Sequence, residues 1–257
     1  MGDIISVHSF RGGTGKSNVT ANLATNFAQR GLKVGIVDTD IQSPGIHVLF
    51  GFDESTVNKA LNDYLWGMAK IEECAYDLSK TAALDPDRAY LKGLPIWLIP
   101  SSIRTGEIAR VLREGYDVGL LNEGFHDLMD TLELDYLFVD THPGLNEETL
   151  LSLAISTGLV ILLRPDQQDF QGTAVTVDVA RRLEVPKLRL VVNKALRRLD
   201  FEDMKRTLGE TYGAKVSGIL PLDHDVAYNA SNHIFSAVNP NHEWSKTINA
   251  IADDMLS

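Results

Sequence analysis

Short apolar runs alternate along this chain with longer segments in which apolar residues recur every three or four positions. The short runs predict β-strands, and the longer segments predict amphipathic helices. This alternation is typical of an α/β fold with a single doubly wound, mostly parallel sheet flanked by helices. The predicted strands cover residues 4–8, 34–37, 96–99, 136–139, 160–163, 188–192 and 216–220.

Periodicity is weaker over residues 53–93, where a turn at 84–87 interrupts the pattern, so we expect a helix and an irregular connection there. The 257 residues, 44% of them hydrophobic, are enough to form one large core. We therefore predict one domain over residues 1–257. In such sheets a ligand binds outside the carboxyl ends of the strands, where polar motifs occur in this chain.

A glycine-rich segment at residues 10–17, Phe-Arg-Gly-Gly-Thr-Gly-Lys-Ser, joins the first predicted strand to a predicted helix. Glycines allow the backbone amides to turn toward a phosphate, Lys16 supplies a positive charge, and the Ser17 hydroxyl is a ligand for Mg²⁺. The segment predicts a phosphate-binding loop. The residues expected to bind the nucleotide are Gly12, Gly13, Thr14, Gly15, Lys16, Ser17 and Asn18.

The Gly-Gly pair and the Gly-Lys-Ser triplet resemble the deviant Walker A motif of the MinD/ParA family of dimerising P-loop ATPases, and the resemblance extends over nearly the whole chain. In that family a lysine before the Gly-Gly pair reaches the phosphates of the partner subunit. Arg11 holds this position here, and Phe10 replaces the usual first glycine. The resemblance implies that Arg11 and Lys16 act on the transferred phosphate, since arginine keeps the charge. Alternatively, Arg11 only solvates the outer edge of the loop.

Acidic residues follow two of the predicted strands, Asp38 and Asp40 after the second and Asp140 after the fourth. By resemblance, Asp40 orients the attacking water, Asp38 lies close to Mg²⁺, and Asp140 holds a water on the metal. Asp38 and Asp40 are also compatible with a solvated turn. The resemblance further implies that Gly144 offers its amide to the γ-phosphate. His142 is either a packing or interface residue or a sensor of charge near the phosphate.

Base recognition has candidates in Asn193, whose amide can pair with a purine edge, and Pro221, which resembles the family's second adenine-side element. GTP-binding proteins place an aspartate where this chain has Leu196, so the sequence favours ATP. The alternative for Asn193 is a cap at the end of a strand.

Cys74 is the only cysteine among the 257 residues. Iron–sulfur carriers and nickel-insertion ATPases with this loop use paired cysteines, so the sequence argues against those roles. No apolar run has the roughly 20 residues that span a bilayer, and residues 243–256 are acidic where a membrane-docking helix is basic. We therefore expect a cytoplasmic protein that does not bind membranes.

The net charge of −11 argues against general binding of polyanions, yet residues 181–215 hold ten basic and five acidic side chains. This segment leaves two partners open: nonspecific DNA, which would associate the protein with the nucleoid, or another protein.

The resemblance implies a switch that forms a homodimer with ATP and Mg²⁺, hydrolyses ATP to ADP and phosphate, and positions or regulates a cargo under the control of an unidentified stimulating protein. The alternative is a ligase-type P-loop enzyme that phosphorylates a small-molecule carboxylate. Bacterial tyrosine kinases of this superfold end in a tyrosine cluster, whereas the last tyrosine here is Tyr228.

Overall fold

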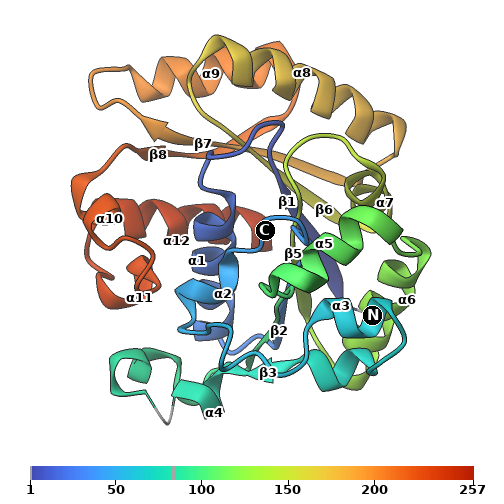
Figure 1. Ribbon diagram of the computed structural model, residues 1–257. Coiled ribbons are helices and arrows are strands. Elements are labelled where there is room, and N and C mark those ends of the chain that lie inside the picture. The colour runs from blue at the N-terminus through green and yellow to red at the C-terminus, as the bar shows by residue number, and fades with distance from the viewer. Residues whose placement is uncertain (1, 83–84) are drawn as a thin grey trace.

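A single eight-stranded sheet forms the centre of the computed structural model, which describes residues 2–82 and 85–257 (Figure 1). Seven strands are parallel, and the edge strand β3 pairs antiparallel with β4. The predicted doubly wound α/β fold is confirmed. In spatial order the strands are β3 (Tyr76–Asp77), β4 (Ile96–Ile99), β2 (Val34–Asp38), β5 (Tyr136–Asp140), β1 (Asp3–His8), β6 (Gly158–Leu163), β7 (Lys187–Ala195) and β8 (Lys215–Pro221).

Helices cover both faces of the sheet, with α1 and α12 on one side and α6 and α7 on the other (Figure 1). Strands β5 and β6 are consequently buried on both faces and read as continuous apolar runs. The first face carries α1 (Lys16–Gln29), α2 (Ile46–Leu49), α4 (Leu78–Ala82), η2 (Pro86–Leu91), α10 (His224–Tyr228), α11 (Phe235–Val238) and α12 (Glu243–Leu256). The second face carries α3 (Leu61–Leu65), η1 (Ile71–Cys74), α5 (Thr105–Glu114), α6 (Gly119–Thr131), α7 (Glu147–Ile155), α8 (Gln167–Arg182) and α9 (Phe201–Tyr212).

The seven predicted strands are all present, with ends that differ by a few residues from those expected. Residues 53–93 are more structured than the sequence predicted, since they contain α3, η1, β3, α4 and η2. Strand β3 has two residues, too few for an alternating pattern to reveal it. Residue 84, in the predicted turn at 84–87, lies outside the described residues.

Helix α12 packs its apolar side against α1 and β8. Trp244, Ile248, Ile251 and Met255 on this side are buried. The apolar face of α12 is therefore covered within the chain. None of the helices in residues 2–82 and 85–257 has the length and apolar character needed to cross a membrane.

The order of the strands brings three loops together at one edge of the sheet. Strand β1 pairs with β5 on one side and with β6 on the other, and β2 pairs with β5. The register places Asp140 beside both Val7 and Asp38. Because these strands are parallel, the loops after β1, β2 and β5 leave the same edge, where ligands bind in doubly wound folds.

Candidate functional site

The loop between β1 and α1 is shaped to bind an anion. Gly13 and Gly15 have positive φ angles of 77° and 92°, which side chains other than glycine adopt only with strain. Gly15 is also the N-cap of α1, and no side chain caps this end of the helix or contributes a negative charge to its first turn. The first amides of α1 are consequently left without an intrahelical partner, as in known phosphate sites.

Lys16 and Asp140 form a buried ion pair at the floor of this loop, with 3.0 Å between Nζ and Oδ1. Thr20, one turn further along α1, donates its hydroxyl to the same oxygen at 3.4 Å. The other oxygen of Asp140, Oδ2, is buried and has no hydrogen-bond partner among the described residues. A buried acceptor without a partner is costly, and it indicates a ligand, a water or an ion at this point.

Asp38 and Asp140 lie opposite each other on β2 and β5 and are both fully buried. Burial raises the pKa of the Asp38 carboxyl well above its ordinary value, and the carboxylates of Asp140 and Asp40 raise it further. Carboxylate oxygens are the ligand type that Mg²⁺ prefers, and the Ser17 hydroxyl and the Asp40 carboxylate are available in the phosphate cavity. The residues present fit a magnesium ion.

A cavity of about 360 Å³ opens above the loop and is lined by residues of the loops after β2 and β5. Asp40, after β2, and His142, after β5, line its far wall, and their side chains are in contact. Gly144 has a φ of 87°, and its amide donates to the carbonyl of Ser9 at 3.2 Å. The amide of Gly144 therefore contacts the phosphate loop, and its expected contact with a γ-phosphate stays a prediction.

A second cavity of about 360 Å³ adjoins the first, and both are lined by Gly15, Asn18 and Ser231. Its remaining walls include Asn193 and Pro221, the two candidates for base recognition. The pair of cavities has the size and continuity expected for a nucleotide, with the phosphates in the first and the base in the second.

Asn193 also holds the phosphate loop in place. Its Nδ2 donates to the carbonyl of Thr14 at 2.8 Å, and its Oδ1 accepts from the amide of Lys194. Lys194 in turn donates from Nζ to the carbonyl of Gly13 at 2.7 Å. The structure thus gives Asn193 a structural role at the end of β7, and its contact with a base stays a prediction.

Arg11 lies on the outer side of the loop, where its side chain is 41% exposed. It donates to the Gln168 side chain at the start of α8 and lies 3.8 Å from the Asp169 carboxylate. Asp169 is itself held by Arg164 through two charge-assisted hydrogen bonds of 3.0 Å. Arg11 is therefore accessible for a second subunit but bound to α8 in the single chain.

Three residues of the site escaped the sequence analysis. Lys194 and Ser231 are non-glycine residues with positive φ angles of 58° and 63°, a backbone conformation that only the structure reveals. His8, at the end of β1, is fully buried, and its Nδ1 lies 2.8 Å from the Thr141 hydroxyl. Because that hydroxyl donates to the carbonyl of Val7, it accepts from His8. Burial, followed by the charges of Lys16 and His142, lowers the pKa of His8 to about 3.

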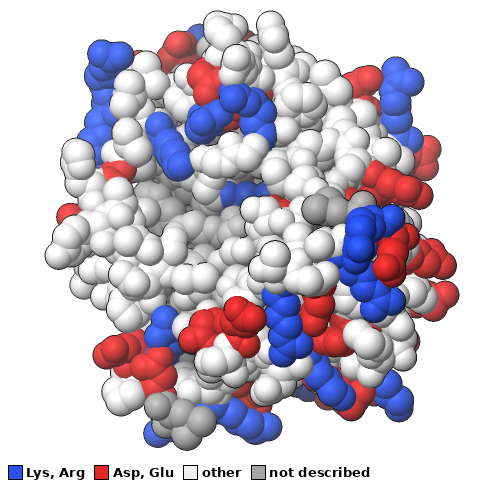
Figure 2. Space-filling model, in the orientation of Figure 1, with Lys and Arg blue, Asp and Glu red and all other residues white. Residues whose placement is uncertain are grey.

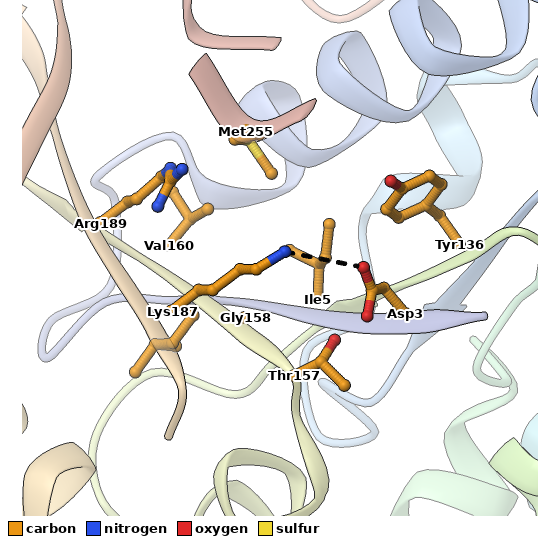
Figure 3. A pocket seen from close by; sticks show the side chains of 10 residues that line it. Asp3, Ile5, Tyr136, Thr157, Gly158, Val160, Lys187, Arg189 and Met255 are labelled. Atoms are coloured by element: carbon orange, nitrogen blue, oxygen red, sulfur yellow. Dashed lines mark ion pairs between the residues drawn. The ribbon is translucent and has the colours of Figure 1, made fainter. Parts of the chain in front are cut away.

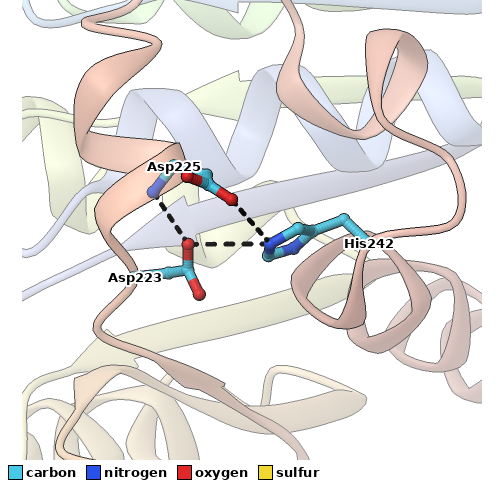
Figure 4. A group of neighbouring side chains, drawn as sticks. All are labelled: Asp223, Asp225 and His242. Carbon is cyan, nitrogen blue, oxygen red and sulfur yellow. Dashed lines mark hydrogen bonds and ion pairs between the residues drawn. The ribbon is translucent and has the colours of Figure 1, made fainter.

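A cluster of Asp223, Asp225 and His242 beside the second cavity has side chains of metal-ligand type (Figure 4). Nδ1 of His242 accepts the amide of Trp244 at 3.1 Å and so caps α12. The proton of a neutral ring is consequently on Nε2, which lies 3.7 Å and 3.5 Å from the two carboxylates. Neither ring nitrogen offers a lone pair to a metal, and the cluster joins α10 to α12.

A separate small cavity lies at the opposite edge of the sheet, near the amino ends of β1 and β7 (Figure 3). Lys187 and Asp3 approach to 4.0 Å beside it, and Tyr136 and Met255 line it. Its volume of about 20 Å³ holds about one water. It therefore has no part in nucleotide binding.

The basic segment 181–215 is largely neutralised within the chain. Arg189 and Lys215 both pair with Asp254, and Arg197 pairs with Asp223 and Glu243. On the face seen in Figure 2, Lys and Arg side chains are interspersed with Asp and Glu side chains. Among the described residues, the basic side chains of this segment without an ion pair are Arg181, Lys194, Arg198 and Lys205, of which the first two donate to backbone carbonyls.

Comparison with known proteins gives a family and two groups of similar chains. The model of the ParA family, described as NUBPL iron-transfer P-loop NTPase, matches residues 1–256. An uncharacterized ATP-binding protein of Methanocaldococcus jannaschii is 26% identical over 194 residues, which cover 76% of this chain and 65% of that protein. An iron-sulfur cluster carrier protein of Pseudomonas fragi is 29% identical over 241 residues, covering 90% of this chain and 76% of the relative.

Solved structures of cell division proteins share the fold. The cell division ATPase MinD of Pyrococcus furiosus superposes with a TM-score of 0.82 at 21% identity, covering 100% of this chain and 99% of that one. The septum site-determining protein MinD of Pyrococcus horikoshii, in complex with Mg-ADP, gives a TM-score of 0.80 at 21% identity and covers 99% and 96% of the two chains. At these identities the likeness concerns the fold alone.

Proposed function

Because the chain belongs to the ParA family of P-loop NTPases, we propose that it is a Mg²⁺-dependent ATPase that forms a homodimer with ATP and returns to monomers after hydrolysis. The observation that carries the proposal is the pair of adjoining cavities around the uncapped N-terminus of α1, with Asp40 lining the phosphate end and Asp140 paired with Lys16 of the loop. The family assignment supports ATP binding and a P-loop ATPase in general terms. The dimerisation and its control are our inference.

Each of these residues has a proposed role that follows from its chemistry. The amides of residues 12–18 and the Lys16 ammonium bind the phosphates, and Ser17 and Asp140 hold Mg²⁺, with Asp38 behind them. The metal supplies charge neutralisation to the transferred phosphate. Asp40, on the far wall of the cavity, orients the attacking water.

Dimerisation would bring Arg11 of each chain to the phosphates bound by the other. The guanidinium is on the open side of the loop and 41% exposed, while Phe10, Leu150 and Val175 place exposed apolar side chains on neighbouring elements. A second copy would cover these side chains and supply the positive charge that stabilises phosphoryl transfer. In the single chain Gln168 holds Arg11, so ATP-dependent pairing must replace that contact.

The Pseudomonas relative is named an iron–sulfur cluster carrier. This chain lacks the ligands that such a cluster needs. Clusters are held by several cysteine thiolates, and Cys74 is the only cysteine. Cys74 is fully buried beneath α6, and burial raises the pKa of its thiol to about 12. We infer that this chain uses the ATP-driven cycle without carrying a cluster.

Without a cluster to carry, the ATP-driven cycle acts through other molecules that recognise the ATP-bound state. Most basic side chains of segment 181–215 are paired within the chain, which favours a protein partner over DNA. We propose that a protein reads the ATP-bound dimer and stimulates hydrolysis, and that the complex positions or regulates a cargo.

Hydrolysis of ATP and GTP by the whole chain with Mg²⁺ tests the enzymatic part, with Lys16→Ala as the control. The proposal expects slow release of phosphate from ATP, faster than from GTP, and none from the Lys16→Ala variant. Reconstitution with iron and sulfide under reducing conditions tests the exclusion of a cluster. Stoichiometric iron and sulfide retained on the protein, with visible charge-transfer absorption, would contradict it.

A further inference from the structure

A hydrogen bond joins the loop after β2 to the loop after β5 at the wall of the phosphate cavity. Asp38 and Asp140 are register partners at the ends of β2 and β5. The residues two positions after each of them therefore also come together. These residues are Asp40 and His142, with 2.6 Å between Oδ1 and Nδ1. Their side chains are 13% and 25% exposed, and both line the cavity.

The direction of this bond follows from the chemistry of the two groups. A carboxylate only accepts hydrogen bonds, so Nδ1 of His142 carries the proton and donates it to Asp40. The backbone on each side is also fixed. The amide of Asp40 donates to Asp38 at 3.0 Å, and the carbonyl of His142 accepts from the hydroxyl of Thr149, on α7, at 3.2 Å.

We propose that His142 is a positioning residue for ATP hydrolysis, which fixes the carboxylate of Asp40 in the orientation needed to hold the attacking water. This inference rests on the proposed function, in which Asp40 orients that water. A carboxylate in a loop has several rotamers, and a charge-assisted hydrogen bond from an anchored ring selects one of them. Small displacements of a group that orients a reactant reduce the rate strongly.

The same bond connects two loops that contact different parts of the site. Asp40 belongs to the loop after β2, whereas His142 belongs to the loop that begins at Asp140 and reaches Gly144. The carboxylate of Asp40 consequently has its hydrolytic orientation only when both loops are in place. This contact was not predictable from local sequence patterns, because residues 40 and 142 are 102 positions apart.

Substitutions that keep or move the donor test the proposal. In His142→Asn the side-chain amide N–H lies close to the position of Nδ1; in His142→Gln it lies further out, and His142→Ala has no donor. We expect His142→Ala to lower kcat roughly 10- to 100-fold, the effect of one charge-assisted hydrogen bond. We expect KM for ATP and the dissociation constant of a nonhydrolysable analogue to stay within about twofold. His142→Asn should recover more of kcat than His142→Gln.

A double-mutant cycle with Asp40→Ala shows whether His142 acts through Asp40. The proposal expects the double variant to hydrolyse ATP at the rate of Asp40→Ala alone. Independent, multiplicative losses would overturn it, as would a loss of analogue binding in His142→Ala or equal rates for the Asn and Ala variants. If Asp40→Ala itself hydrolyses ATP at the wild-type rate, the role of Asp40 in the proposed function is wrong. Normal hydrolysis in His142→Ala beside an inactive Asp40→Ala would overturn only the role of His142.

Discussion

The ring of Phe10, in the phosphate loop, packs against Gly172 on α8, in the space that any larger residue at position 172 would need. A Cβ atom on residue 172 would lie 2.7 Å from Cβ of Phe10, closer than real Cβ contacts. Phe10 stands where such loops usually begin with glycine, and Gly172 provides the space that this substitution needs. The two positions are thus matched, and together with Arg11 and Gln168 they join the loop to α8.

Gly172→Ala should therefore destabilise the protein by about 1–3 kcal/mol, the usual effect of overpacking, and weaken nucleotide binding by displacing the loop. Urea unfolding and titration with a fluorescent ATP analogue measure the two effects. Phe10→Gly combined with Gly172→Ala should restore much of both, because it removes the Cβ and the ring of residue 10 that a Cβ at position 172 would meet. A double variant as impaired as Gly172→Ala alone would mean that the packing of Phe10 is not the cause.

Lys16→Ala should lower the affinity for ATP on the order of 100-fold, because the ammonium is the charge closest to the phosphates. The substitution also leaves the buried carboxylate of Asp140 without the 3.0 Å partner that it has in this structure. Calorimetric titration with ATP and Mg²⁺ measures the loss. Lys205→Ala is the matched control, since that exposed lysine on α9 lines neither cavity. Equal affinities of the Lys16→Ala and wild-type proteins would contradict the assignment of the loop.

Arg11→Ala should prevent ATP-driven dimerisation, whereas Arg11→Lys should retain it, if the role of Arg11 is a charge contact with the partner's phosphates. Light scattering with ATP and Mg²⁺ distinguishes the variants when hydrolysis is blocked by Asp40→Ala. Dimers formed equally well by the Arg11→Ala and Arg11→Lys variants would favour the alternative that Arg11 only solvates the outer edge of the loop.

Acid should destabilise the nucleotide-free protein through His8. The folded-state pKa of about 3 is below the unfolded value of 6.5, so the unfolded chain binds the additional proton. The stabilisation is fully present above pH 6.5 and is lost as the pH falls toward 3. Between pH 7 and pH 5 this amounts to about 2 kcal/mol. Urea unfolding should show a decrease larger by that amount in the wild type than in His8→Gln, with the exposed His224→Gln as the control. Equal decreases in the wild type and His8→Gln would contradict the burial argument.

The sequence predicted the strands and most of the site because both depend on local patterns. Apolar runs identify strands that are buried on both faces, and the glycines, Lys16 and the strand-end carboxylates occur in short motifs. The registers of parallel strands then bring those motifs to one edge of the sheet.

Contacts between distant side chains were not predictable from the same patterns. The pairing of His142 with Asp40, the binding of Asn193 to Thr14 and the contact of Arg11 with Gln168 depend on distances that a single sequence does not encode locally. Strand β3 was missed for a related reason. Its two residues are held by pairing with β4 and by the Tyr76 hydroxyl, which accepts the amides of Asn58 and Lys59.

Light scattering of the Asp40→Ala protein, with ATP and Mg²⁺ and again with ADP and Mg²⁺, shows whether ATP drives dimerisation, because it measures the molar mass in solution. The substitution should leave the phosphate loop intact and block ATP hydrolysis, so that the ATP-bound dimer does not dissociate. We expect a dimer with ATP and a monomer with ADP. A monomer in both nucleotides, with ATP binding confirmed by titration, would contradict it.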